Sequence, residues 1–468
     1  MAEKRKKPAS GRPQAPPKKT SQGMELTDNP RLAAFRVLKE TLVGRTPEEV
    51  LTSHGLLLSP KDLGLATALV YEVLRHRGRL DWLMKSRLSQ GKASADLTIV
   101  LYLGLAQLLF FQRLGDHAVV SETVALAKAV TPGRHGLVNA VLRGLLRDRD
   151  SALPWPSEPV PSGDAVSYLA TLYSYQKWLV RKMLGRFSRP ECEALLVAGN
   201  QPTPPTLRVN PLRINREELQ AKLPFESRPT ALSPWGLAAA AFSGRPEDWP
   251  GFAEGQFALQ DEASQLAALI CGDLPEGAEI LDACSGLGGK ALALAAAYPK
   301  AFITARDKDR AKLDLLQREA GRLGCGNIKC EAEDMLAAGP GEPQQFDLVL
   351  IDAPCSGLGV IRRRPDLKWS KNEDDVTRLA ALQLKLLSAG AKMVRPGGRL
   401  LYGVCSFSDE EGPGVLAKFL ASQAEFSVAG SEAWPGALRG HLGSEPYLRL
   451  WPHIHDTDGF FWALLIRK

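Results

Sequence analysis

The sequence predicts a multi-domain protein in which an all-α bundle near the amino terminus precedes an α/β, Rossmann-like domain. Two observations support this prediction. Between about residues 29 and 150, apolar side chains recur every three or four positions, which is the spacing of amphipathic helices that pack as a bundle. After Gly251, short apolar runs alternate with longer amphipathic stretches, a pattern typical of a parallel, doubly wound sheet. The predicted segments are 1–24, 25–150, 151–250 and 251–468.

The first two segments are both basic. Residues 1–24 are rich in Lys, Arg and Pro and contain too few apolar residues to form a core, so we expect a disordered tail. Residues 1–22 contain seven Lys or Arg and one Glu, and residues 30–150 contain 17 Lys or Arg and 11 Asp or Glu. This concentration of positive charge, within a net charge of +7, favours binding of a polyanion such as RNA. A basic surface can also serve solubility alone, and the charge does not separate the two.

The third and fourth segments carry the predicted strands. Residues 151–250 begin with a Pro-rich linker, 151–163, and continue as a small α/β segment with an extended stretch at 206–210. In residues 251–468 we expect long helices at 310–323 and 376–394, the second ended by Pro396-Gly397-Gly398. Strands are expected at 278–283, 302–307, 328–331, 346–352, 399–404 and 460–466. Ligands of such a sheet bind at the carboxyl ends of its strands.

Composition excludes several classes of protein. The longest apolar stretch, residues 99–111, is shorter than the roughly 18 to 20 residues that span a bilayer. Prolines in the basic tail occupy the place where a signal peptide would have its apolar core. The seven cysteines form no Cys-x-x-Cys pair, which argues against a zinc site and a disulfide framework. We therefore expect a cytoplasmic monomer with reduced thiols, no membrane association and no metal.

A glycine-rich turn indicates a nucleotide-type cofactor. Residues 279–290 have the pattern of a strand, a turn with Gly286, Gly288 and Gly289, and a helix. Glycines there allow the backbone to approach a ligand closely. Asp307 ends the next strand, where it can accept hydrogen bonds from ribose hydroxyls, and Asp334 follows the third strand. This layout suits an adenosine cofactor but does not distinguish NAD from S-adenosylmethionine, and the glycines could also serve only the turn.

Two cysteines follow neighbouring predicted strands. Asp352 and Cys355 lie at or just past the end of one strand, and Cys405 lies at the end of the next. Addition of a thiolate to carbon 6 of cytosine makes carbon 5 nucleophilic enough to attack an electrophilic methyl group. Cys405 and Asp352 suit the thiolate and the acid near ring nitrogen 3, and Cys355 is the nearest group to assist release. The alternative is that these cysteines are small apolar core residues.

An arginine-rich loop follows the first of these cysteines. Four positive charges and an aromatic ring in this loop suit phosphate contacts and base stacking, so we expect it to bind RNA, unless it is only a solvated loop. The expected contacts are Arg362, Arg363, Arg364, Lys368 and Trp369.

The motifs together resemble the RsmB (Sun) family of RNA cytosine-5 methyltransferases. The resemblance rests on residues 260–265, 282–290, 352–359, 363–369 and 405–406, and covers about residues 160–468. Residues 119–127 and 136–143 look like a NusB-type RNA-binding domain. The resemblance implies methylation of carbon 5 of a specific cytosine in 16S ribosomal RNA, with S-adenosylmethionine as cofactor and a covalent cysteine adduct.

The resemblance also implies roles for individual residues. Cys405 would be the nucleophile, Cys355 would act in product release, and Asp352 would serve both catalysis and cofactor binding. The remaining cofactor residues would be Cys284, Ser285, Gly286, Leu287, Gly288, Gly289, Lys290, Asp307 and Asp334.

The sequence departs from the family pattern at several positions. The glycine-rich turn lacks the usual proline and threonine, Val404 replaces a threonine, and residues 411–413 read Glu-Gly-Pro instead of Glu-Asn-Glu. Two alternatives therefore stay open. One is a non-catalytic RNA-binding scaffold for ribosome assembly, and the other is an adenosine-cofactor enzyme that acts on a small molecule or a protein.

Overall fold

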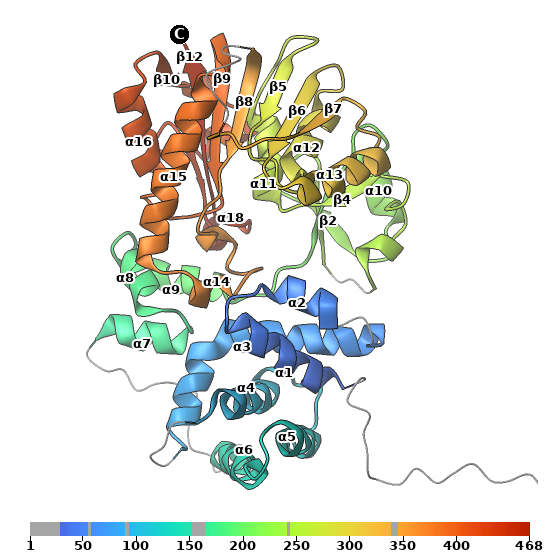
Figure 1. The fold of residues 1–468 in the computed structure, drawn as a ribbon, viewed down its shortest axis with the longest axis vertical. Coiled ribbons are helices and arrows are strands. Elements are labelled where there is room, and N and C mark those ends of the chain that lie inside the picture. Colours follow the sequence, from blue (N-terminus) through green and yellow to red (C-terminus); the bar gives the residue numbers. More distant parts are fainter. Residues whose placement is uncertain (1–28, 55–57, 89–92, 151–163, 241–243, 338–344) are drawn as a thin grey trace, which may run out of the picture.

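The computed structural model describes residues 29–54, 58–88, 93–150, 164–240, 244–337 and 345–468. Within these ranges, a helical part built from the first third of the chain lies against one end of an α/β part (Figure 1). The predicted tail, 1–24, and the predicted Pro-rich linker, 151–163, lie outside the described residues.

The first third of the chain forms helices, as predicted. They are α1 (Pro30–Thr41), α2 (Pro47–His54), α3 (Pro60–Lys85), α4 (Ala95–Phe110), α5 (Asp116–Val130) and α6 (His135–Asp150). Side-chain caps define where several begin: Asn29, Ser59 and Ser94 accept hydrogen bonds from the first-turn amides of α1, α3 and α4. Residues of α4 are buried on nearly all sides, so this helix is the centre of the bundle.

A second group of elements connects the bundle to the large sheet. The short helices α7 (Ala165–Leu172), α8 (Lys177–Leu184) and α9 (Arg189–Ala198) share a core with Leu358, Ile361 and Trp451. An antiparallel sheet follows, in the order β2-β3-β1-β4. Its elements are β1 (Thr206–Val209), α10 (Arg216–Lys222), β2 (Ser227–Pro229), β3 (Gly236–Ala239), the 3-10 turn η1 (Pro246–Asp248) and β4 (Phe257–Leu259). The small sheet therefore includes one strand, β4, that lies past the segment boundary predicted at residue 250.

The large sheet has the order β10-β12-β9-β8-β5-β6-β7, with β11 paired to β12. Its strands are β5 (Glu279–Asp282), β6 (Phe302–Asp307), β7 (Ile328–Ala332), β8 (Phe346–Asp352), β9 (Val394–Val404), β10 (Phe426–Val428), β11 (Leu448–Leu450) and β12 (Phe460–Arg467). All six predicted strands are present, and β5 to β9 are parallel. The expected parallel arrangement does not extend to β12, which runs antiparallel to β9. Strand direction depends on the connection between strands, which an apolar run does not reveal.

Helices cover both faces of this sheet (Figure 1). On one face, α11 (Glu262–Ile270), α12 (Gly289–Ala297) and α13 (Arg310–Leu323) pack on Ile280, Leu348 and Leu401. On the other, α15 (Glu373–Ala391) and α16 (Pro413–Ser422) pack on Leu281 and Val349. Successive strand residues thus enter opposite cores, which is the doubly wound arrangement. The remaining short elements are η2 (Leu358–Val360), α14 (Leu367–Ser370), η3 (Ser431–Ala433), α17 (Gly436–Arg439) and α18 (Pro452–His455).

The end of α15 differs from the prediction. The helix ends at Ala391, and Pro396-Gly397-Gly398 lies inside β9 instead of terminating the helix. Phe346 pairs with Val394 while Leu348 pairs with Arg399, so the extra residues of β9 form an irregularity in the ladder. Gly397, at φ +75°, permits this bend.

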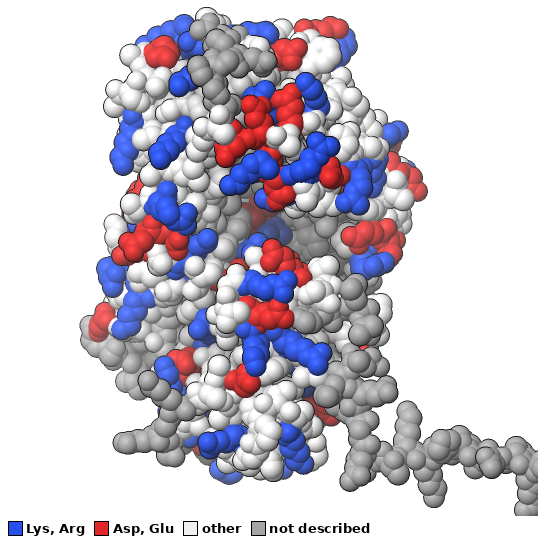
Figure 2. Space-filling model, viewed as in Figure 1, with Lys and Arg blue, Asp and Glu red and all other residues white. Residues whose placement is uncertain are grey.

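Surface charge is mixed on the face shown in Figure 2, where blue and red side chains are interspersed over both the helical and the α/β parts. Across the ranges given above, none of the helices has the length and apolar character that a membrane crossing requires.

Candidate active site

Three parallel neighbours, β5, β8 and β9, bring the predicted site residues to one edge of the sheet. Asp282 pairs with Leu350 of β8, and Asp352 pairs with Gly403 of β9, so Asp282, Asp352 and Cys405 all lie near the carboxyl ends of adjacent strands. The antiparallel strand β12 begins at this same edge, because Phe461 pairs with Val404. The edge therefore holds acidic, sulfur and aromatic groups from four strands.

The two predicted cysteines meet at this edge. Their sulfur atoms lie 3.0 Å apart, at hydrogen-bonding distance, and both residues are partly exposed. The hydrogen bond with Cys405, together with burial, raises the pKa of Cys355 well above its ordinary value. The two residues thus form a hydrogen-bonded pair in which Cys355 holds its proton more tightly than an ordinary cysteine does.

A buried glutamate that the sequence interpretation did not assign to the site connects the two cysteine loops. Glu411 is fully buried, and its carboxylate accepts hydrogen bonds from the amide and hydroxyl of Ser356 and from the hydroxyl of Ser406. These serines directly follow Cys355 and Cys405. The repeated Cys-Ser dipeptide was the sequence signal that could have marked the two serines. Nothing in the sequence showed that one carboxylate would bind both serines.

Lys290 and Asp352 form an ion pair beside the cysteines, with 2.5 Å between Lys290 Nζ and Asp352 Oδ2. Burial alone would lower the pKa of Lys290, but the carboxylate of Asp352 outweighs it and the pKa is raised. The ammonium also lies 5.1 Å from the ring of Phe460 and 5.8 Å from that of Trp462. Lys290 is thus held as a cation between an acid and two aromatic rings.

Asp282, at the end of β5, is buried, and among the described residues no side chain donates a hydrogen bond to either of its carboxylate oxygens. Burial, assisted by the nearby charge of Asp352, raises the pKa of Asp282 to about 7, and Lys290 counteracts this only in part. The carboxyl group is thus partly protonated near neutral pH.

The glycine-rich turn has the geometry that a cofactor site requires. Gly286 and Gly288 have φ of +54° and +83°, so both use the left-handed region that favours glycine. A Cβ on Gly288 would come within 2.2 Å of Leu316 Cγ, whereas one on Gly286 would meet nothing within 4 Å. Gly288 therefore serves the packing of α12, and the turn is open at Gly286. Its neighbour Leu287 is 62% exposed.

Polar atoms around this turn fit S-adenosylmethionine. Asp307 accepts hydrogen bonds from the amides of Gly286 and Asp309, which fixes its carboxylate beside the turn. The hydroxyl of Ser285 is buried without a partner among the described residues. Because buried polar groups are usually hydrogen-bonded, this hydroxyl is a candidate contact for a polar ligand. Cys284 lies nearby with its pKa raised by burial and by Asp282. Asp334 is exposed on the loop after β7, where it accepts a hydrogen bond from the amide of Leu336.

The arginine-rich loop is placed differently from the expectation. Lys368 is fully buried, and its ammonium donates to the carbonyls of Arg75 and Ser174 and to the side chain of Asn200. The indole N–H of Trp369 donates to the carbonyl of Leu74, at 2.6 Å. These two side chains therefore join α14 to the helical part of the molecule.

The arginines of this loop pair with acids. Arg362 is 5% exposed and donates to Asp458. The predicted RNA contact is thus wrong for Lys368 and Arg362, because buried side chains with internal partners cannot reach a phosphate, and the indole N–H of Trp369 is already used. Arg363 and Arg364 are partly exposed, although they pair with Asp261 and Asp366, and their RNA contact stays a prediction.

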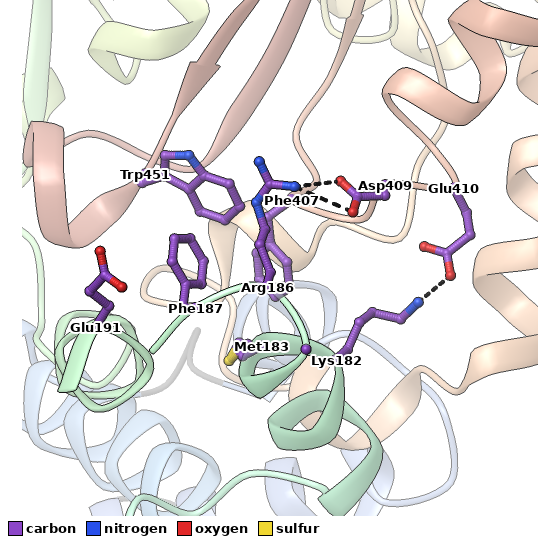
Figure 3. A pocket seen from close by; sticks show the side chains of 10 residues that line it. Lys182, Met183, Arg186, Phe187, Glu191, Phe407, Asp409, Glu410 and Trp451 are labelled. Atoms are coloured by element: carbon purple, nitrogen blue, oxygen red, sulfur yellow. Dashed lines mark hydrogen bonds and ion pairs between the residues drawn. The ribbon is translucent and has the colours of Figure 1, made fainter. Parts of the chain in front are cut away.

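A pocket of about 780 Å³ lies between α8, the start of α9, residues 407–410 and Trp451 (Figure 3). Arg186 stands in its centre, 5.2 Å from the ring of Trp451, and pairs with Asp409. Lys182 reaches across to Glu410. These ion pairs connect the loop that follows Cys405 to α8.

Comparisons with known proteins agree with this architecture. The model of the 16S rRNA methyltransferase RsmB/F family matches residues 270–466, the NusB family model matches residues 28–147, and an RsmF/B-like ferredoxin-like domain model matches residues 175–239.

Two curated relatives are similar over most of their length. A probable ribosomal RNA small subunit methyltransferase B of Bacillus subtilis is 33% identical over 88% of this chain and 92% of its own. A ribosomal RNA small subunit methyltransferase B of Pseudomonas putida is 34% identical over 94% of this chain and 98% of its own.

Two solved structures share the fold. The crystal structure of PH0851 covers 95% of this chain and 100% of its own, with a TM-score of 0.74 and 25% identity. The structure of NSun6 from Pyrococcus horikoshii with SFG covers 63% of this chain and 99% of its own, with a TM-score of 0.55 and 22% identity.

Proposed function

Because this chain belongs to the RsmB family of ribosomal RNA small subunit methyltransferases, we propose that it methylates carbon 5 of a cytosine in 16S ribosomal RNA through a covalent adduct on Cys405. The coarser activity follows from the family: S-adenosylmethionine-dependent methylation of ribosomal RNA. The observation that supports the finer proposal is the 3.0 Å approach of two sulfur atoms at the carboxyl edge of the sheet.

Bound S-adenosylmethionine supplies an electrophilic methyl group. The turn residues 284–290 together with Asp307, Asp334 and Asp352 would hold it, because the turn is open at Gly286 and carries the buried, unpartnered hydroxyl of Ser285. The turn lacks the proline and threonine that are usual in the family, but it keeps the opening at Gly286 and the buried hydroxyl of Ser285.

Cys405 starts the reaction on the base. Its thiolate adds to carbon 6 of the cytosine, a sulfur–carbon bond forms, and the electron pair of the carbon 5–carbon 6 double bond makes carbon 5 nucleophilic. Cys355 supports this step because its proton, retained by a raised pKa, stabilises the thiolate. Asp352 and Lys290 form the polar pair that faces ring nitrogen 3 and stabilises the charge that develops there.

Release requires removal of the proton from methylated carbon 5. Its electron pair restores the double bond, and the pair of the sulfur–carbon bond returns to Cys405. Cys355 is the nearest base. In the adduct Cys405 is a thioether and no longer raises the pKa of Cys355, so Cys355 passes its proton to solvent and its thiolate accepts the proton of carbon 5.

The cytosine must leave its stack to reach a sulfur at the sheet edge, so the substrate is single-stranded or extruded RNA. The helical part, residues 28–147, matches the NusB family and is the part that we propose to hold the flanking RNA, with Arg363 and Arg364 nearer the site.

Transfer of tritium from labelled S-adenosylmethionine to unmodified 16S RNA tests the proposal. We expect the unaltered protein to label the RNA and Cys405→Ala to be inactive. Bisulfite sequencing of the product would locate the modified cytosine. Full activity of Cys405→Ala would reject the mechanism, and labelling of an atom other than carbon 5 would reject the proposed position.

A further inference from the structure

We propose that Glu411 is a positioning residue that sets the spacing of the Cys355 and Cys405 sulfur atoms. Its consequence for methyl transfer rests on the proposed function, whereas the spacing itself is argued from contacts alone.

The carboxylate of Glu411 bridges two loops that come from different strands. Oε1 accepts the backbone N–H of Ser356 at 2.7 Å, and Oε2 accepts the hydroxyl of Ser406 at 2.6 Å. The hydroxyl of Ser356 also donates to Oε2, and the two serine hydroxyls lie 3.1 Å apart. Since each serine directly follows a site cysteine, fixing the two serines fixes the relative position of the two sulfur atoms.

Glu411 is itself held by rigid elements. Gln383 on α15 donates to Oε1 at 3.0 Å and to the carbonyl of Pro354 at 2.9 Å, and the hydroxyl of Tyr402 on β9 donates to the backbone carbonyl of Glu411. Gln383, Tyr402 and Glu411 are all completely buried. Because α15 and β9 fix the position of Glu411, its hydrogen bonds fix both loops relative to these two elements.

The chemistry of the carboxylate explains why this position needs glutamate. Four donors converge on two oxygens, and a carboxylate is the side chain that accepts from all four. Alanine would leave these donors unsatisfied in a buried site. Glutamine would keep the two N–H contacts on its oxygen, and the two hydroxyls can rotate to accept from its amide group.

The negative charge of Glu411 has a second effect. It contributes, after Cys405 and burial, to raising the pKa of Cys355. Glu411→Gln should therefore preserve the spacing of the sulfur atoms but lower the pH at which Cys355 becomes reactive. A purely structural contribution to folding would not move that pH.

Disulfide formation between Cys355 and Cys405 measures the spacing directly. Diamide accepts the two electrons and two protons that the thiols lose, and the bonded peptides are quantified by mass spectrometry. We expect Glu411→Ala to slow this cross-link by about tenfold or more, because its buried donors must find other partners and the loops shift. Glu411→Gln should stay within about twofold of the unaltered protein, with Cys355 alkylated by iodoacetamide at lower pH.

Glu410→Ala is the matched control, because Glu410 is the neighbouring glutamate and its side chain pairs with Lys182 on α8 (Figure 3). It should leave the cross-link rate unchanged. If Glu411→Ala does not fold, as judged by circular dichroism and thermal unfolding, Ser406→Ala replaces it and should slow the cross-link less strongly.

The proposal would be overturned if folded Glu411→Ala cross-links as fast as the unaltered chain. The same holds for folded Ser406→Ala where it replaces Glu411→Ala. An unchanged alkylation profile in Glu411→Gln would reject the effect of the Glu411 charge on Cys355. Neither assay needs RNA or S-adenosylmethionine, so a protein that fails to methylate RNA but shows these effects would contradict only the proposed function.

Discussion

The ammonium of Lys368 lies 2.7 Å from the backbone carbonyl of Arg75, although 293 residues separate the two in the sequence. The ammonium has two further acceptors, the carbonyl of Ser174 and the side chain of Asn200, and lies 4.1 Å from the ring of Tyr175. Burial lowers the pKa of Lys368 well below its ordinary value. One side chain thus joins α14 to the helical part and to the α7–α9 segment.

Lys368→Met should destabilise the protein by about 2–3 kcal/mol, because three buried acceptors lose their donor. Chemical denaturation at neutral pH measures this change. Lys418→Met, at an exposed lysine of α16, serves as the control and should leave the unfolding midpoint almost unchanged. Equal midpoints for the two variants would contradict the role assigned to Lys368.

Asp282→Asn should change how stability depends on pH. The folded-state pKa of Asp282 is about 7, raised from an ordinary value of 3.8. Between these values the unfolded chain loses the proton while the folded chain keeps it, so ionisation of Asp282 destabilises the fold as pH rises, and the full effect is reached above about pH 7. Below the ordinary pKa, both states are protonated and the effect is absent.

The free energy of unfolding of Asp282→Asn, relative to the unaltered protein, should therefore increase steadily from about pH 4 to about pH 8. Urea titrations across this range provide the measurement. Asp273→Asn, at an exposed carboxylate, should show no comparable trend. A difference between Asp282→Asn and the unaltered protein that is constant with pH would mean that Asp282 titrates normally.

Lys290→Gln should lower the rate of methyl transfer by about 100-fold or more, because the charge that develops on the base loses a preorganised cation. The ion pair with Asp352 and the contacts to Phe460 and Trp462 hold this ammonium in place. Binding of 16S RNA, measured by filter retention, should stay within about twofold. A large loss of RNA affinity with unchanged turnover would assign Lys290 to RNA binding instead.

Cys355→Ser should accumulate a covalent protein–RNA complex when S-adenosylmethionine is present. Serine keeps the size of the side chain but is a much weaker proton acceptor, so addition and methylation proceed while release slows. Denaturing gels would show a slowly migrating band that is absent from the Cys355→Ser, Cys405→Ala double variant. If no band forms, Cys355 does not act in release.

The sequence predicted most of the elements that position the site. The apolar runs at 302–307 and 346–352 and the helix at 310–323 have the predicted bounds, because burial on both faces of a sheet leaves a clear apolar pattern. The meeting of Cys355 with Cys405 also followed from strand order, since parallel neighbours end at the same edge.

Other features depended on contacts between distant segments. Charged residues usually face solvent, so the sequence indicated an exposed loop where Arg362 and Lys368 are buried against Asp458 and three polar acceptors. In the sequence, Glu411 stood out only as part of the departure from the family pattern at 411–413, and only the fold brings Ser356 and Ser406 to its carboxylate.

In the proposed mechanism, Cys405 bonds to carbon 6 of a cytosine in 16S RNA. RNA that contains 5-fluorocytidine tests it most directly, because fluorine at carbon 5 cannot leave as a proton does and the adduct cannot resolve. With S-adenosylmethionine present, we predict a stable complex whose RNA-linked peptide contains Cys405. No complex, or an RNA link at any other residue, would contradict the mechanism.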